Sequence, residues 1–294
     1  MNVQNRVRSP LPMPSRSLAL ARRWSFDFFS HAGVLLVMGT IVLPIAWIML
    51  TAFKTPRDVY SLNAALVFVP TLENLYTVFA HPWNLGDKIL NSLIVSLGTV
   101  VLATPMATMA AYAFSRFEFP FKKFLFLLVI ASQFIPAAVV VLPYFLMFKA
   151  YGMLDTKIAL ILVNLSIVLP YAVWMIKGFL DAVPIEIEES AMVDGAPRWR
   201  VLAEIMVPAA WPGIITAAVF SFTLTWNEFL FALTFVLDNN ERTVPVSISL
   251  ISGASKYDIP WGNIMAASVL VTIPLLGLVL AFQKKIVSGL TAGA

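Results

Sequence analysis

Few side chains in this 294-residue chain are suited to catalysis. It contains no cysteine, and its two histidines, His31 and His81, stand far apart in the sequence. Neither the Gly-x-Ser-x-Gly elbow of serine hydrolases nor the His-Glu-x-x-His pair of zinc proteases is present, which disfavours a hydrolase. The sequence also lacks the Gly-x-x-x-x-Gly-Lys-Ser/Thr phosphate loop. We therefore expect no catalytic site, no metal site and no ATP hydrolysis in this chain.

The remaining polar groups of interest stand inside long apolar stretches, where hydrogen bonding is their available chemistry. A carboxylate at the centre of a bilayer costs about 2.5–3.5 kcal/mol on insertion scales, so such a group is expected to face protein or water. Glu228 is the only carboxylate well within a stretch of this kind. Amides and carboxylates hydrogen-bond to sugar hydroxyls, and aromatic rings stack on sugar faces. The candidate lining of a substrate pathway is Gln133, Asn164, Tyr171, Trp226, Asn227 and Glu228.

The same residues also fit a structural role. Asn, Gln, Ser and Thr side chains commonly tie transmembrane helices together, each contributing about 0.6 kcal/mol on average. Glu228 fits a structural acid at a helix junction in the same way. The sequence leaves both interpretations open.

The apolar stretches themselves indicate a membrane protein. Hydrophobic residues make up 60% of the chain and charged residues 12%, which excludes a soluble globule and a disordered chain. A helix needs about 20 mostly apolar residues to cross the hydrocarbon core. Prolines lie in or near most of the qualifying stretches, which predicts kinked helices that bury one another. The six predicted spans are Phe29–Phe53, Leu90–Phe114, Phe124–Phe148, Lys157–Ile176, Trp211–Val236 and Gly262–Gln283.

The distribution of Lys and Arg predicts the orientation of the spans, because cytoplasmic loops hold the excess. The two termini and the loops on their side hold 13 of the 20 Lys and Arg residues, and the other loops hold 7. Both termini are therefore expected in the cytoplasm. A net charge of +4 with this distribution does not make a nucleic-acid-binding patch. We expect a basic cytoplasmic tail over 1–28, a six-helix domain over 29–283 and a cytoplasmic C-terminal tail over 284–294.

The one long cytoplasmic connection, residues 177–208, carries the most informative pattern. Pro184 suits the first position of a short helix, and the acidic residues that follow it suit the positive end of the helix dipole. Gly195 suits the residue just past the end of that helix. A first short helix is therefore predicted between these two residues.

A second short helix is expected over Arg198–Val207. Its residues Trp199, Leu202 and Met206 recur at helical spacing and are predicted to share one face. Each of the two helices has about ten residues, fewer than the roughly 12–15 at which an isolated helix becomes marginal in water. The pair therefore needs a packing partner.

This loop resembles the coupling motif of the membrane subunits of ATP-binding-cassette (ABC) importers. That motif is Glu-Ala-Ala, three residues, Gly, nine residues, Ile, one residue and Leu-Pro. The matching positions are Glu189-Ser190-Ala191, Gly195, Ile205 and Val207-Pro208. Every spacing fits, and the two departures, Ser190 and Val207, are mild changes in size.

Two further segments resemble the carbohydrate branch of the same family. They are Trp226-Asn227-Glu228-Phe229-Leu230 and Gly289-Leu290-Thr291-Ala292-Gly293. The resemblance extends over nearly everything after the basic tail, and within the branch the chain is similar to the second permease subunit of maltose-type importers. Members of the family continue for a few residues beyond the position of Ala294.

The resemblance implies an all-α integral membrane protein with six transmembrane helices and the type I importer permease fold. It also implies partners: a second permease subunit in a heterodimer, two ATPase subunits that carry ATP and Mg, an extracytoplasmic sugar-binding protein, and the bilayer of the bacterial inner membrane. The first short helix would sit in a groove of an ATPase subunit. The residues carried over as coupling positions are Glu186, Glu189, Ala191, Asp194 and Gly195.

The resemblance also assigns roles to both membrane faces. The loop around Asn239–Tyr257 would contact the binding protein. The tail from Lys284 is similar to tails that reach into the ATPase dimer, and a frayed end anchored to the membrane by Lys284 and Lys285 fits it equally well. In maltose-type members the other permease makes most direct sugar contacts.

Two alternatives to a disaccharide or oligosaccharide importer remain. Within the same family, the substrate could be a polyol or a glycerol phosphate. In a different class, a stand-alone ion-coupled carrier would favour several buried charges and a repeat with broken helices. Only one buried acid is visible in the sequence.

Overall fold

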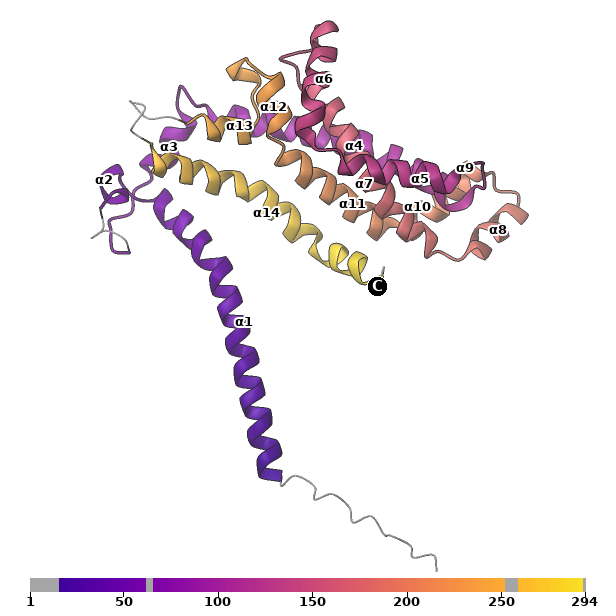
Figure 1. Cartoon of the computed structure of the whole chain (residues 1–294), viewed down its shortest axis with the longest axis horizontal. Helices are drawn as coiled ribbons and strands as arrows, with labels where there is room; N and C mark the ends of the chain where they lie inside the picture. Colours follow the sequence, from indigo (N-terminus) through magenta and orange to yellow (C-terminus); the bar gives the residue numbers. More distant parts are fainter. Residues whose placement is uncertain (1–15, 62–65, 252–258, 293–294) are drawn as a thin grey trace, which may run out of the picture. The chain divides into compact units, whose positions relative to one another are not determined.

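The computed structural model describes the backbone of residues 16–61, 66–251 and 259–292 (Figure 1). Side chains are described over 30–61, 66–251 and 259–283. The start of the predicted N-terminal tail, part of the predicted binding-protein loop and the side chains of the C-terminal tail lie outside these ranges. Residue contacts divide the chain into two units, Met1–Leu50 and Thr51–Ala294, and each is described by itself.

The whole described part of the first unit, residues 16–50, belongs to one helix, α1 (Arg16–Ala52). Its section Ser30–Ala52 is long and apolar enough to cross a bilayer, as predicted for the first span. Pro44 lies inside this helix. The helix begins within the segment predicted as a tail, because the residues that follow Arg16 include a run of good helix formers, Leu and Ala.

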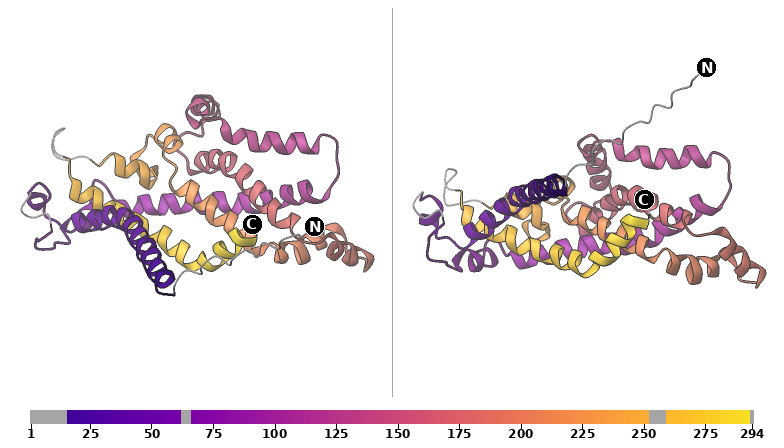
Figure 2. Two further views of the ribbon diagram at one scale, coloured as in Figure 1. Left: turned by 60° about the horizontal axis from the view of Figure 1, so that its bottom comes forward. Right: turned by 90° about the horizontal axis from the view of Figure 1, so that it is seen from below.

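The second unit contains helices and, in its described residues, no strand. Figure 2 shows it from two further directions. Four long helices form its body: α4 (Leu85–Arg116), α7 (Lys157–Asp181), α11 (Trp211–Trp226) and α14 (Trp261–Ala292). The shorter elements are α2 (Pro56–Val59), α3 (Glu73–Phe79), α5 (Lys122–Ala131), η2 (Ser132–Phe134), α6 (Ala137–Ala150), α8 (Ile185–Val193), α9 (Arg198–Arg200), η3 (Val201–Met206), α10 (Val207–Ala209), α12 (Leu230–Phe235), η4 (Asn239–Glu241) and α13 (Val244–Ser249).

Small residues let α4 and α7 pack closely. Every fourth residue of α4 from Val95 through Thr99, Ala103 and Ala107 to Ala111 is buried. Residues four apart form one ridge along a helix, and small side chains on that ridge allow two backbones to approach. Helix α11 packs across both α4 and α7, and α14 packs on α11. This four-helix body is the frame to which the loops attach.

Two of the predicted spans are broken helices rather than continuous ones. The stretch Phe124–Phe148 divides into α5 with η2 and then α6, which are bent by 95° at the break. The break coincides with Pro136, which caps α6, lacks an N–H donor and disfavours helical backbone at the preceding residue. The stretch Trp211–Val236 divides into α11 and α12, which are separated by residues 227–229.

The number of apolar helices agrees with a multi-pass membrane protein. Four helices in the described part of the chain are long and apolar enough to cross a bilayer, and the number rises to six if each of two bent pairs counts as one span. The second bent pair joins residues 198–209 to α11 at an angle of 79°. The prediction of an all-α integral membrane fold is confirmed. The fifth predicted span, Trp211–Val236, shares only α11 with the second bent pair, whose other half lies in the segment predicted as the cytoplasmic loop.

Candidate functional site

The predicted first short helix of the cytoplasmic loop is α8, and its end explains the glycine of the motif. Gly195 has a φ of +86°, a left-handed conformation that favours glycine. Its N–H donates to the Met192 carbonyl at 3.1 Å, and the N–H of Ala196 donates to the Ala191 carbonyl at 3.0 Å. These two bonds form a Schellman motif, which satisfies the last carbonyl groups of the helix.

Most of the predicted coupling residues lie on the solvent-exposed side of this helix or just past its end. Glu186, Glu189, Asp194 and Gly195 are exposed, and Ala191 is half-buried against the core of the loop. The same helix exposes apolar side chains, Ile185, Ile187, Met192 and Val193, the last of them by 87%. Exposed apolar groups with acidic neighbours are typical of a protein-binding surface.

Glu188 was predicted only as one of the acidic residues at the start of this helix, and its buried role was missed. It is 3% exposed, and its carboxylate forms an ion pair with the guanidinium of Arg116. The hydroxyl of Tyr112 donates to the same carboxylate at 3.0 Å. Glu186 and Glu189 lie about 60° apart around the helix at 100° per residue, whereas Glu188 points well away from Glu186. That angular difference was a usable signal for its inward direction.

Arg116 also ties the start of α8 to the end of α4. Its guanidinium donates to the Val183 carbonyl at 2.7 Å and to the Ser115 hydroxyl at 3.1 Å. Ser115 in turn donates to Asp181 at 2.6 Å, and Asp181 pairs with Lys177 at 2.5 Å. The ends of α4 and α7 and the start of α8 therefore share one polar network.

The predicted second helix is present, but its middle is a π-helix. Residues 198–209 form α9, η3 and α10, and Val201 and Met206 of the π-helical part η3 are fully buried. Residues five apart share a face in a π-helix, so these two point the same way. The prediction for Trp199 was wrong, since its side chain is 66% exposed. The wider turn also makes room for Pro208, which cannot donate to the carbonyl four residues earlier.

Three of the predicted pathway residues lie on or against α7. Gln133, in η2, donates from its side-chain amide to the Ile167 carbonyl at 3.1 Å. Asn164 is buried and donates to the Leu160 carbonyl of its own helix at 2.8 Å. Tyr171 is 36% exposed, and its ring lies 5.2 Å from that of Phe220 on α11. Their role in lining a pathway stays a prediction.

The other three pathway residues lie at the break between α11 and α12. Trp226 is buried and stacks on Phe222 of its own helix. Asn227 is exposed and donates to the Thr223 carbonyl at 2.8 Å. Glu228 accepts from the N–H groups at the start of α12, with distances of 2.7 Å from Phe231 and 3.0 Å from Ala232. Both of its oxygens are thus engaged at the N-terminus of a helix, where a carboxylate is favoured.

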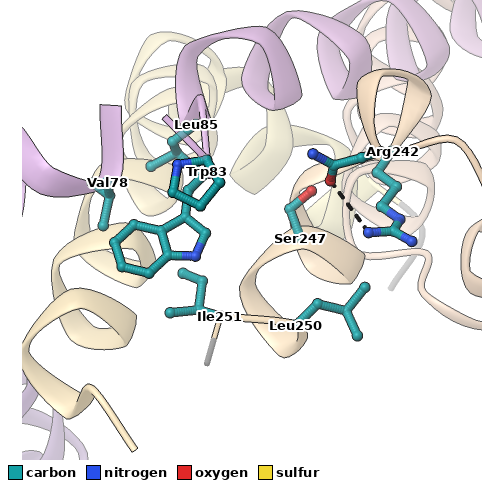
Figure 3. A pocket seen from close by; sticks show the side chains of 9 residues that line it. Val78, Trp83, Leu85, Arg242, Ser247, Leu250 and Ile251 are labelled. Atoms are coloured by element: carbon teal, nitrogen blue, oxygen red, sulfur yellow. Dashed lines mark hydrogen bonds between the residues drawn. The ribbon is translucent and has the colours of Figure 1, made fainter. Parts of the chain in front are cut away.

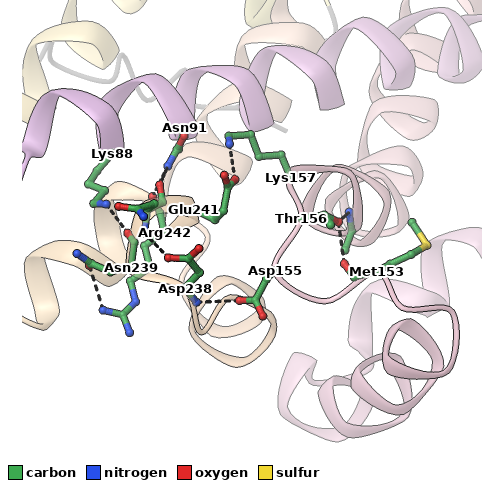
Figure 4. A network of polar contacts seen from close by, with 12 residues as sticks. Lys88, Asn91, Met153, Asp155, Thr156, Lys157, Asp238, Asn239, Glu241 and Arg242 are labelled. Carbon is green, nitrogen blue, oxygen red and sulfur yellow. Dashed lines mark hydrogen bonds and ion pairs between the residues drawn. The ribbon is translucent and has the colours of Figure 1, made fainter.

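At the far end of α4, side chains hold the backbone of residues 237–244 (Figure 4). Lys88 is 1% exposed and donates to the Asn239 carbonyl. Asn91 donates to the Asn240 carbonyl at 2.6 Å and to the Arg242 carbonyl at 3.0 Å. Ser92 accepts from the N–H of Val244 at 2.9 Å. We call residues 237–244 the outer segment.

A second anchor of the outer segment comes from the loop before α7. One carboxylate oxygen of Asp155 accepts from the N–H groups of Leu237 at 2.5 Å and Asp238 at 2.8 Å. Lys157 forms an ion pair with Glu241. Figure 4 shows these contacts beside those from α4. The outer segment is thereby fixed from two sides.

A cavity of about 210 Å³ opens next to the outer segment (Figure 3). Its wall combines aromatic, basic and apolar groups, including Trp83, Arg242, Ser247 and Leu250. It does not include any of the predicted pathway residues. Over the described ranges, no three His, Cys, Asp or Glu side chains lie close enough together to hold a metal ion.

The sequence and the fold both match known proteins. The model of the family described as "Binding-protein-dependent transport system inner membrane component" matches residues 103–291. The trehalose transport system permease protein SugB of Mycobacterium tuberculosis is 34% identical over 88% of this chain and 94% of that protein. The trehalose/maltose transport system permease protein MalG of Thermococcus litoralis is 35% identical over 89% of this chain and 96% of that protein.

The fold also matches a chain from the crystal structure of a bacterial ABC transporter involved in the import of the acidic polysaccharide alginate. The TM-score is 0.76 at 18% sequence identity, and the match covers 93% of this chain and 99% of that chain. At this low sequence identity, the structural similarity shows the fold alone.

Proposed function

Because the chain belongs to the family of binding-protein-dependent transport system inner membrane components, we propose that it is one of two permease subunits of an ATP-driven sugar importer. As a family member it is a non-catalytic membrane subunit of an ABC transporter. A second permease completes the translocation path as a heterodimer. Two separate ATPase subunits bind ATP and Mg and supply the driving force.

The observation that carries the coupling role is the exposed surface of α8. The helix is anchored on its inner side by Glu188 and leaves Glu186, Glu189 and Asp194 exposed among apolar side chains. A short amphipathic helix presented in this way suits a groove with an apolar floor and a basic rim. We assign that groove to an ATPase subunit.

The substrate class follows from the relatives. SugB and the Thermococcus MalG are named for trehalose and maltose, which are disaccharides, and we propose a disaccharide or oligosaccharide for this chain. Exposed Asn227 and Tyr171 supply an amide and an aromatic ring that suit sugar hydroxyls and sugar faces. We place them on the pathway, with Gln133 and Asn164 supporting its wall.

The outer segment and the following helix α13 are the surface that we assign to a sugar-binding protein. Their backbone is fixed by α4 and by the loop before α7, which leaves the exposed side chains of Asp238, Asn239 and Asn240 available to a partner. A bacterial inner membrane location is consistent with the family description. The binding protein would then deliver sugar from the extracytoplasmic side.

Reconstitution into liposomes tests this function. The chain alone, and the chain with its co-expressed permease, ATPase and binding protein, would be assayed for uptake of radiolabelled disaccharides with and without ATP. We expect concentrative uptake only from the full set of partners with ATP. Concentrative uptake by the chain alone, driven by an ion gradient, would contradict the importer function and favour a secondary carrier.

A further inference from the structure

Helix α4 connects the two surfaces of the second unit to which we assign partners, namely α8 and the outer segment. It is one helix of 32 residues, which corresponds to about 48 Å at 1.5 Å per residue. Helix α8 lies beside its C-terminal end, and α13 and the outer segment lie beside its N-terminal half (Figures 1 and 2). The contacts at the two ends differ from ordinary surface contacts in their burial.

At the C-terminal end, the ion pair between Arg116 and Glu188 is almost removed from solvent. The two side chains are 10% and 4% exposed. Separating a buried pair leaves charge without a partner, which costs far more than separating a surface pair. The added bond from Tyr112 fixes the carboxylate in a single orientation. A displacement of α8 therefore carries the end of α4 with it.

At the N-terminal end, three buried side chains hold the outer segment. Lys88, Asn91 and Ser92 are 1%, 6% and 2% exposed, and they lie within two consecutive turns of α4. All three bond to backbone groups between Asn239 and Val244. Loss of any of these partners would leave a buried polar group unsatisfied. The outer segment therefore follows this end of α4.

Between the two ends, α4 continues as one helix through Pro105, which lies inside it, and its packing against neighbouring helices holds this part in place. The ridge of small buried residues from Ser96 and Thr99 to Ala111 lies against α7. Close-packed interiors transmit displacement rather than absorb it.

We propose that α4 is a rigid connecting rod between the coupling helix and the outer segment, and that Arg116 and Glu188 are the positioning residues that attach α8 to it. The proposal rests on the proposed function, since it assumes an ATPase subunit at α8 and a binding protein at the outer segment. It assigns a route by which a loaded binding protein stimulates ATP hydrolysis. Coupling between two binding free energies is reciprocal, so the binding of ATP and the docking of the binding protein would each change the affinity for the other by the same factor.

Spin-label distances in the assembled complex test the attachment of α8 to α4 directly, and the absence of cysteine makes labelling simple. One pair of labels joins Met109→Cys on α4 to Val193→Cys on α8, at positions that are 56% and 87% exposed. A reference pair joins Val193→Cys to Leu280→Cys on α14, which is 54% exposed. We expect the reference distance to change between the nucleotide-free and vanadate-trapped states while the α4–α8 distance stays constant. A change in the α4–α8 distance as large as that of the reference pair would overturn the proposal.

Variants test whether the attachment matters for coupling. The double variant Arg116→Gln/Glu188→Gln removes both charges together, which avoids a lone buried charge. We expect the complex to assemble and its ratio of stimulated to basal ATP hydrolysis to fall about tenfold, within the usual range of allosteric couplings. Glu118→Gln is the matched control, because the Glu118 side chain in its pair with Lys122 is 89% exposed. A wild-type ratio in the assembled double variant would show that the pair only supports the fold.

A substitution at the N-terminal end of α4 gives a second test. Asn91→Leu should also lower the ratio of stimulated to basal ATP hydrolysis. Combining it with the double variant should lower that ratio little further, because two changes that interrupt the same connection are not additive. Independent, multiplicative losses would contradict a single rod. Where a variant fails to assemble, the spin-label pair decides, since it leaves both attachments intact. The two proposals can fail separately. If uptake requires ATP and all partners but these variants keep the wild-type stimulation ratio, the role of α4 as a connecting rod is contradicted and the proposed importer function is retained.

Discussion

The two ends of α4 hold their loops by different chemistry. At the coupling end, most bonds join side chain to side chain, as in the contacts of Glu188 with Arg116 and Tyr112, and Arg116 also donates to the Val183 carbonyl. At the outer end, the side chains of Lys88 and Asn91 bond to backbone carbonyls. A backbone group is present whatever residue occupies the position. The position of α8 therefore depends on particular side chains in α8 itself. The position of the outer segment does not, because its backbone is what α4 holds.

This difference suits the partners that we assign to each end. The ATPase groove that we propose would select one kind of helix. The surface of the proposed binding protein would vary with its sugar, and a loop held by its backbone can vary with it. Substitutions at the two ends of α4 test this contrast, from the largest expected effect to the smallest.

The largest effect is expected from Glu188→Ala at the coupling end. It leaves the Arg116 guanidinium buried without a counter-charge, which costs about 3–5 kcal/mol. We expect a lower melting temperature in detergent and loss of the ATPase subunits on purification. The control is Lys177→Gln, which removes one charge from the more exposed ion pair with Asp181. Equal melting temperatures for the two variants would show that the buried pair contributes no more than a surface pair.

At the outer end, Asn91→Leu should cost about 1–3 kcal/mol, because two backbone carbonyls of the outer segment lose their donor. The matched variant Asn240→Ala changes an exposed side chain of the same segment and keeps its backbone groups. We expect thermal unfolding to be altered only by the first. A larger loss from Asn240→Ala would contradict the idea that the backbone holds this segment.

The cap of α8 should show an intermediate effect. No heavy atom lies within 4 Å of a Cβ built at Gly195, so the cost of Gly195→Ala comes from its φ of +86° alone. A left-handed alanine costs about 1–2 kcal/mol. Gly178→Ala is the control, since that glycine lies inside α7 with equal space around it, and alanine should stabilise a helix by about 0.5–1 kcal/mol. Opposite shifts in melting temperature are expected, and shifts of the same sign would contradict the cap.

The smallest effect is expected at the exposed pair of Arg200 and Glu204, whose atoms are 3.6 Å apart. Glu204→Gln should change stability by less than about 0.5 kcal/mol, because exposed pairs contribute little. ATP-dependent uptake should stay at the wild-type rate. A marked loss of uptake with normal stability would place Glu204 in a partner contact and extend the coupling surface beyond α8.

Sequence patterns predicted most of the fold and the motif, for identifiable reasons. Hydropathy located each apolar stretch, and the spacing of Pro184 and Gly195 located α8 within a residue. These features are local, since a proline or a left-handed glycine acts on its own turn. A kink at Pro136 was predicted, but neither the 95° size of that bend nor the break at residues 227–229 was, because an apolar run can be one helix or two at an angle.

The candidate site was predicted on its exposed side and missed on its inner side. Glu189 and Gly195 belong to a motif, whereas the partner of Glu188 lies 72 residues away at Arg116. The contacts of Lys88 and Asn91 span still larger separations. Pairings of this kind depend on how the helices pack, which spacing along the chain does not encode. The π-helix around Val201 likewise shifted the buried face away from Trp199.

The most direct test of the account is a photocrosslink from α8 in the assembled, transporting complex. A photoreactive residue at position 193, where Val193 is 87% exposed, should link to an ATPase subunit, and one at position 69, where Val69 is 81% exposed, should not. That result would place a nucleotide-hydrolysing subunit on the coupling helix. Links from position 193 only to lipid or to this chain itself, in a complex that still imports sugar, would contradict it.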